Sequence, residues 1–146
     1  MPSPSAVLDT NTVLDWLVFG DPATRELARR IETGWLAWRA TPAMRLEFER
    51  VLPRSALAAW APDAERAAEA WDRHAQLQRD EPARGPLLCA DPDDQVFIDL
   101  ALQHRCTWLL SRDRALLRLA RRAAAWGVEV LTPQAWLEQR SGSTPA

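Results

Sequence analysis

Short apolar runs alternate along the chain with segments that carry apolar residues at every third or fourth position. Runs of three to five mainly apolar residues are typical of buried strands, and the longer periodic segments are typical of amphipathic helices. The predicted strands are residues 6–8, 35–39, 87–89, 107–111 and 128–131. The predicted helices are residues 22–32, 42–52, 55–78, 93–105, 114–125 and 133–139, with a further helix starting after the polar turn at residues 10–11. Strands that alternate with helices predict an α/β fold, a parallel sheet with helices on both faces.

Glycine and proline mark the ends of these elements. Gly34 ends one predicted helix, Pro53 ends another and Pro62 interrupts the alanine-rich segment 55–78. No linker or internal repeat divides the chain, so we expect a single domain over residues 1–140. The last residues, 141–146, read SGSTPA and are expected to form a disordered tail.

Acidic residues stand where a parallel sheet places its chemistry. Such sheets bind ligands beyond the carboxyl ends of their strands, near the point where the strand order reverses. Four separate elements supply carboxylates to this region. They are Asp9 after the first strand, Glu47 in the helix after the second, Asp94 with Asp91 and Asp93 after the third, and Asp113 after the fourth.

Two of these carboxylates lie on apolar helix faces. Glu47 is in line with Met44 and Val51, and Asp94 is in line with Phe97 and the apolar residues that follow it. A carboxylate on the inward face of a helix is unusual, because burying a charge is costly unless the charge is paired. This placement favours a functional role over a solvated surface.

Carboxylates that lie close together repel one another, and a bound cation relieves this repulsion. Two like charges about 4 Å apart repel by about 1 kcal/mol in water and by about 4 kcal/mol at an effective dielectric constant near 20. An open set of oxygen ligands suits Mg²⁺ or Mn²⁺, and the chemistry it favours is metal-assisted hydrolysis of a phosphate ester. Helix capping by Asp9, Asp94 or Asp113 is the alternative, as is a pairing of Glu47 with Arg50 or Arg54; Asp91 or Asp93 could also replace Asp94 as the ligand.

The composition excludes several other chemistries. The 146 residues carry 18 basic side chains, all arginine, against 20 acidic ones, a net charge of −2. Because the chain has no lysine, Schiff-base catalysis by a lysine amine and the phosphate-binding loop that ends in Gly-Lys are excluded. Cys89 and Cys106 are too few for a disulfide framework, and we expect both to be buried. No apolar run approaches the roughly 20 residues that span a bilayer, so no membrane partner and a cytoplasmic location are expected.

The acidic motifs resemble those of a known family. They are VLDTN at 7–11, MRLEFERVL at 44–52, DPDDQVFIDLAL at 91–102 and WLLSRD at 108–113. In this order and spacing they are similar to PIN-domain ribonucleases, and more closely to the bacterial branch that supplies the toxins of toxin–antitoxin pairs. The resemblance spans about residues 5–131 and is weakest around residues 55–80. Ser111 stands where the family more often has threonine, which keeps the hydroxyl group.

The resemblance implies a fold and an activity. The implied fold is a sheet of about five parallel strands, and the implied activity is endonucleolytic cleavage of RNA with Mg²⁺ or Mn²⁺. By position, the resemblance assigns the catalytic and metal-ligating roles to Asp9, Glu47, Asp94 and Asp113. Asp94 is preferred to Asp93 because Ala101, the small helix residue of the family, follows it by seven positions. Asn11 and Ser111 match supporting polar positions, and Asp91 is a further supporting candidate.

Arginines and partners complete the hypothesis. Arg45, Arg112 and Arg114 lie close in sequence to the acids and could bind RNA phosphates, although pairing with carboxylates explains them as well. The resemblance implies an antitoxin partner that covers the acidic groove, and the tryptophan content would suit a homodimer. Two rival functions remain: a non-catalytic protein-binding module with the same fold, and a metal-dependent phosphatase that acts on small esters.

Overall fold

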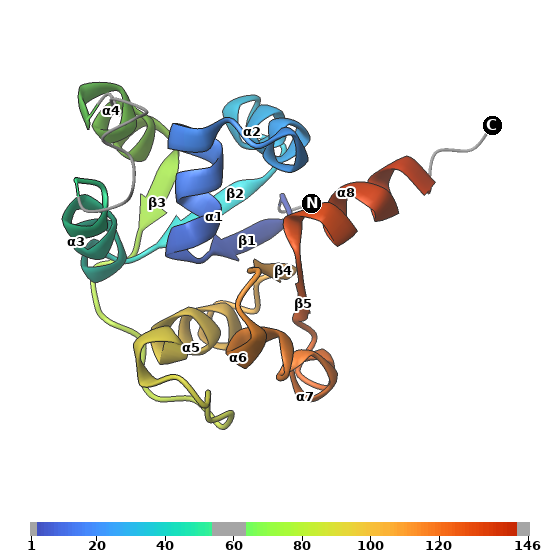
Figure 1. The fold of residues 1–146 in the computed structure, drawn as a ribbon. Coiled ribbons are helices and arrows are strands. Elements are labelled where there is room, and N and C mark those ends of the chain that lie inside the picture. The colour runs from blue at the N-terminus through green and yellow to red at the C-terminus, as the bar shows by residue number, and fades with distance from the viewer. Residues whose placement is uncertain (1–2, 54–63, 143–146) are drawn as a thin grey trace.

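A five-stranded parallel sheet forms the centre of the protein, as the sequence predicts (Figure 1). The structure is a computed structural model and describes residues 3–53 and 64–142. The strands are β1 (Ser5–Leu8), β2 (Ala37–Ala40), β3 (Ala75–Leu77), β4 (Trp108–Leu110) and β5 (Glu129–Leu131). They lie in the order β3-β2-β1-β4-β5, and every neighbouring pair is parallel.

Helices cover both faces of this sheet. They are α1 (Thr10–Leu14), α2 (Arg25–Glu32), α3 (Pro42–Val51), α4 (Ala64–His74), α5 (Gln95–Gln103), α6 (Arg114–Leu117), α7 (Ala120–Ala124) and α8 (Pro133–Gly142). Single turns of other helix types occur at η1 (Asp15–Phe19), η2 (Pro22–Thr24) and η4 (Pro92–Asp94). Figure 1 shows α1 to α4 on one side of the sheet and α5, α6 and α7 on the other. Within the described residues, no helix has the length and apolar character needed to cross a membrane.

The prediction of a strand at residues 87–89 is wrong. Residues 87–89 form no strand, and the third strand of the sheet is instead β3, which directly follows α4 inside a segment that the sequence predicts as helical. The backbone at 87–89 is bonded to a side chain: Gln95 Nε2 donates to the carbonyl of Leu87, and the N–H of Cys89 donates to Gln95 Oε1, both at 2.8 Å. These groups are therefore not available to a strand ladder. Residues 55–63 of the same predicted helix lie outside the described part of the chain.

Two other boundaries differ from the prediction. Helix α1 already begins at Thr10, inside the predicted polar turn 10–11, because Asp9 is its N-cap and Asp9 Oδ1 accepts the N–H of Thr12 at 2.9 Å. The predicted helix 114–125 is divided into α6 and α7, since Arg118 ends the first and Leu119 begins the second. Of the predicted tail, residues 141 and 142 continue α8, and residues 143–146 lie outside the described part.

Aromatic packing joins the helices on one face to the sheet. Trp38 of β2 is 1% exposed and contacts Trp16 of η1 and Trp71 of α4, with ring centroids 5.2 and 4.4 Å apart. Phe48 of α3 packs on Trp71 at 5.6 Å. This cluster holds α3 against β2, and with it the position of Glu47.

Replacement of Trp38 by alanine is expected to lower the free energy of unfolding by about 3–5 kcal/mol, because it leaves a large cavity under three elements. Urea denaturation measures this loss. Trp126 is 56% exposed, so Trp126→Ala is the matched control and should change stability by no more than about 0.5 kcal/mol. Equal losses in the two variants would contradict the packing described here.

Candidate metal centre

The strand order reverses between β1 and β4, and the acidic residues gather at the carboxyl ends of these two strands. The chain leaves β1 toward β2 on one side, whereas β4 lies on the other side of β1. Such a reversal leaves a crevice outside the sheet. Asp9 directly follows β1, Ser111 directly follows β4, and the turn η4 brings Asp91 and Asp94 to the start of α5.

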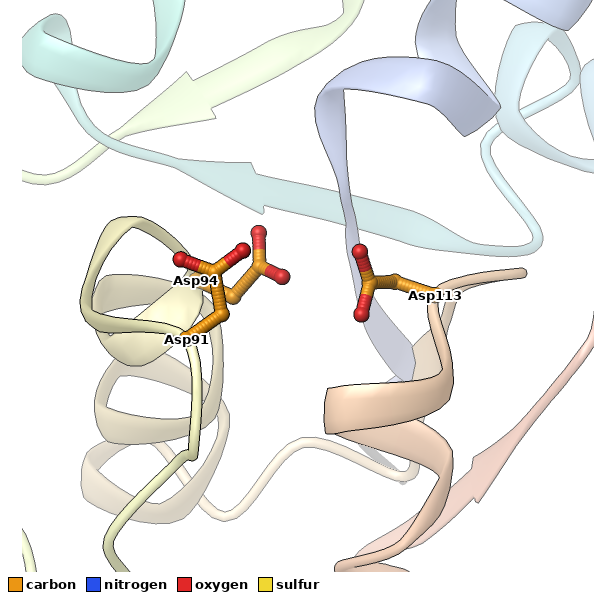
Figure 2. Close-up of side chains that lie close together, drawn as sticks. All are labelled: Asp91, Asp94 and Asp113. Atoms are coloured by element: carbon orange, nitrogen blue, oxygen red, sulfur yellow. The ribbon is translucent and has the colours of Figure 1, made fainter.

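Three carboxylates converge at this crevice. Asp91, Asp94 and Asp113 each offer one oxygen, and these oxygens all lie within 4.8 Å of one another. Figure 2 shows the three side chains pointing toward one another, Asp91 and Asp94 from the turn before α5 and Asp113 from the start of α6. All three residues are partly buried. The sequence predicts Asp94 and Asp113 as ligands and Asp91 only as a supporting residue.

Backbone hydrogen bonds orient two of these carboxylates. Asp91 Oδ1 accepts the N–H of Asp93 at 3.0 Å, and Asp113 Oδ1 accepts the N–H of Ala115 at 2.8 Å. Each is the N-cap of the helical turn that follows it. Capping and metal binding are therefore compatible, since one oxygen of each carboxylate holds the backbone while the other remains available.

Asp94 differs from its two neighbours. It is the N-cap residue of α5 but makes no capping hydrogen bond, and its Oδ2 is buried with no hydrogen-bond partner in the described part of the chain. Burial raises the pKa of Asp94 to about 7, with the charges of Asp113 and Asp91 as the next causes. A buried acceptor without a donor, facing two other carboxylates, is suited to a cation.

Ser111 connects the carboxylate of Asp9, after β1, to the backbone of Asp113, after β4. The Ser111 hydroxyl donates to Asp9 Oδ2 at 2.5 Å, and the Ser111 Oγ accepts a hydrogen bond from the N–H of Asp113 at 2.9 Å. Burial raises the pKa of Asp9, and the hydrogen bonds from Ser111 and Thr12 oppose this shift. Asp9 is outside the group within 4.8 Å, but its charge adds to the rise in the pKa of Asp94.

The structure places Glu47 apart from that group. Glu47 is half-buried on α3, and its Oε2 accepts the hydroxyl of Thr10 at 2.8 Å. Within the described residues it forms no ion pair with Arg50, and Arg54 lies outside them. Because Thr10 follows Asp9 directly, Glu47 is connected to the edge of the site through the first turn of α1. Asn11, in the same turn, is exposed.

Two of the three predicted RNA-binding arginines have carboxylate partners. Arg112 forms a two-point ion pair with Asp15, at 2.9 and 3.0 Å, and Asp15 is buried. Arg45 pairs with Glu49 at 3.1 Å and with Asp72 at 2.5 Å. Arg114 is exposed at the start of α6 and has no ion pair within the described ranges 3–53 and 64–142.

Local sequence explains why Asp91 joins the group. Asp91 is followed by Pro92, which suits the first position of a helical turn, and the turn η4 is a 3₁₀ turn. Asp91 is the N-cap of this turn and Asp94 is its last residue, so a single short turn carries both carboxylates to the site. The Asp-Pro pair was the available signal in the sequence.

Comparison with known proteins places the chain in a family context. A family model described as PIN domain matches residues 5–115. The match runs from β1 to the first turn of α6 and so includes every carboxylate described above. No curated protein matches the chain.

The raised pKa of Asp94 predicts how stability depends on pH. In EDTA, Asp94→Asn is expected to raise the melting temperature by several degrees near about pH 8 and to leave it unchanged near about pH 4. The folded carboxyl stays protonated after the unfolded one ionises, so the wild-type protein loses stability as pH rises from about 4 to about 7. The asparagine side chain does not ionise and avoids this loss.

The matched control is Asp93→Asn, which changes an exposed neighbour outside the group. Its melting temperature should follow the wild-type profile at both pH values. Scanning calorimetry measures all three proteins, and a constant difference between wild type and Asp94→Asn at every pH would rule out the electrostatic explanation.

Proposed function

This chain belongs to the PIN-domain family, and we propose that it is an endoribonuclease that depends on Mg²⁺ or Mn²⁺. The observation that carries the proposal is the convergence of Asp91, Asp94 and Asp113, with a buried oxygen of Asp94 that has no donor in the described part of the chain. An all-carboxylate donor set fits hard divalent cations and does not favour zinc.

Asp91, Asp94 and Asp113 would hold the ion, each through one oxygen. Asp9 would act behind them, since the hydroxyl of Ser111 ties it to the backbone of Asp113. A bound Mg²⁺ or Mn²⁺ supplies a Lewis acid for the phosphodiester and lowers the pKa of water at the site. Because hydrogen bonds already orient Asp9, Asp91 and Asp113, little reorganisation of these three side chains is needed when substrate arrives.

Substrate contacts are proposed at the edge of the group. Arg114 is exposed beside Asp113 and would bind a phosphate group of the RNA through its guanidinium group. Glu47 and Asn11 lie on the neighbouring elements α3 and α1, where they would contact the substrate or a second ion. Arg45 and Arg112 would contribute less, because carboxylates already neutralise them.

The biological role we propose is that of a toxin. The motifs VLDTN and WLLSRD, which resemble the bacterial toxin branch, support this role, and they belong to the two strands at the crevice. A toxin of this kind would cleave cellular RNA in the cytoplasm as one nuclease domain over residues 1–140. Its antitoxin would inhibit it by covering the carboxylates, and a homodimer is compatible with this role.

RNA cleavage by the purified protein is expected to require Mn²⁺ or Mg²⁺ and to stop in EDTA. Asp94→Asn should lower the cleavage rate by at least about 100-fold, since losing a ligand costs no less than losing a partner of a ligand. Asp9→Asn should also abolish cleavage while circular dichroism shows an intact fold. Asp93→Asn is the control with near wild-type rates, and undiminished cleavage by Asp9→Asn would refute the role given to Asp9.

The rival functions give different results in the same assays. A phosphatase would hydrolyse a chromogenic phosphate monoester faster than a structured RNA, whereas the proposed nuclease should cleave the RNA and leave the monoester intact. A non-catalytic module would show no heat of Mn²⁺ binding in a calorimetric titration. Either result would exclude the proposed activity.

A further inference from the structure

The segment of residues 83–89, before α5, is held by side chains of that helix. Alternate residues of the segment bond to α5 through their backbone groups. The bonds join Ala83 N–H to Gln103 Oε1 at 3.0 Å, Gly85 N–H to Asp99 Oδ1 at 2.9 Å, and the Leu87 carbonyl and Cys89 N–H to the amide of Gln95, each at 2.8 Å. In Figure 1 this segment lies beside α5, away from the sheet.

The spacing of these bonds has a geometric cause. Gln95, Asp99 and Gln103 are four residues apart, so they recur about every 6 Å along one face of the helix. Residues 83, 85, 87 and 89 of the segment bond to these three side chains, with residues 87 and 89 both bonded to Gln95. A row of polar side chains on α5 therefore supplies the hydrogen bonds that these backbone groups need.

Gln95 has the central position in this row. Its Oε1 accepts from Cys89, and its Nε2 donates both to the Leu87 carbonyl and to Asp99 Oδ1, the latter at 2.9 Å. Cys89 precedes Asp91 by two residues, and Gln95 directly follows Asp94. The amide thus connects the two ends of the turn that carries both carboxylates.

We propose that Gln95 is a positioning residue for the metal centre, whose amide holds the turn closed so that Asp91 and Asp94 converge on Asp113. The inference rests on the proposed metal-dependent function. Repulsion between the three carboxylates favours an open turn in the absence of an ion, and the hydrogen bonds of Gln95 oppose that opening. The closed turn offers the ion a site that is already assembled.

Calorimetric titration with Mn²⁺ tests this role without reference to activity. Gln95→Ala should weaken Mn²⁺ binding by about tenfold or more, the cost typical of losing a group that orients a ligand, which corresponds to about 1.4 kcal/mol. Gln103→Ala is the matched control, because it removes a bond of the same kind at the far end of the row. It should lower the melting temperature and leave the Mn²⁺ dissociation constant unchanged.

A second variant keeps the test decisive if Gln95→Ala does not fold. Gln95→Glu preserves the shape of the side chain but removes both donors and turns a carboxylate toward Asp99. The added negative charge would by itself tighten Mn²⁺ binding, so weaker binding can come only from a displaced turn. Adding Asp99→Asn restores a donor at this contact and should recover part of the lost affinity.

The outcomes separate the two proposals. Wild-type protein that binds no Mn²⁺ would overturn the metal site and this inference together. If the wild-type protein binds Mn²⁺ and both Gln95→Ala and Gln95→Glu bind it with the wild-type affinity, the inference alone is overturned. The inference is supported if the Gln95 variants bind Mn²⁺ more weakly and Gln103→Ala binds it as the wild type does. The electron paramagnetic resonance spectrum of Mn²⁺ bound to the Gln95 variants should also be broadened.

Discussion

The electrostatic cost of gathering carboxylates at one end of the sheet is the constraint on which this structure depends. Asp91, Asp94 and Asp113 repel one another, and the charge of Asp9 adds to the repulsion on Asp94. At the separations seen here the repulsion in a partly buried site is of the order of a few kcal/mol, a large part of the stability of a small domain. The surrounding structure must hold these residues together until a cation arrives.

Hydrogen bonds supply that restraint, and most of them come from the backbone. Asp9, Asp91 and Asp113 each cap a helical turn, so the fold uses one oxygen of each carboxylate to fix the other. Ser111 joins the two strands across the reversal of strand order. The positive end of a helix dipole also favours negative charge, which suits the placement of Asp94 at the start of α5. The same elements that cost stability therefore build a site for a divalent ion.

A good part of this arrangement was predictable from the sequence. Alternating strands and helices predicted the parallel sheet, and the rule for reversed strand order predicted the edge at which the acids would lie. The residues that the prediction placed differently are informative. Glu47 lies apart from the three converging carboxylates and bonds to the hydroxyl of Thr10, whereas Asp91 lies among them as the N-cap of the 3₁₀ turn that ends at Asp94. Both depend on side-chain direction, which periodicity does not specify.

The sequence by itself determined many local features: most of the helical segments, where proline and aspartate begin a turn, and which residue types are available for chemistry. These follow from backbone sterics and from contacts within a few residues, so a single chain segment contains the information. Only the tertiary structure decided which partner each polar group takes. The run at 87–89 has the pattern of a strand but bonds to Gln95, and Arg112 pairs with Asp15, 97 positions away. Such choices are made by competition between distant groups, because each buried donor and acceptor must find a partner and the sequence alone does not rank the candidates.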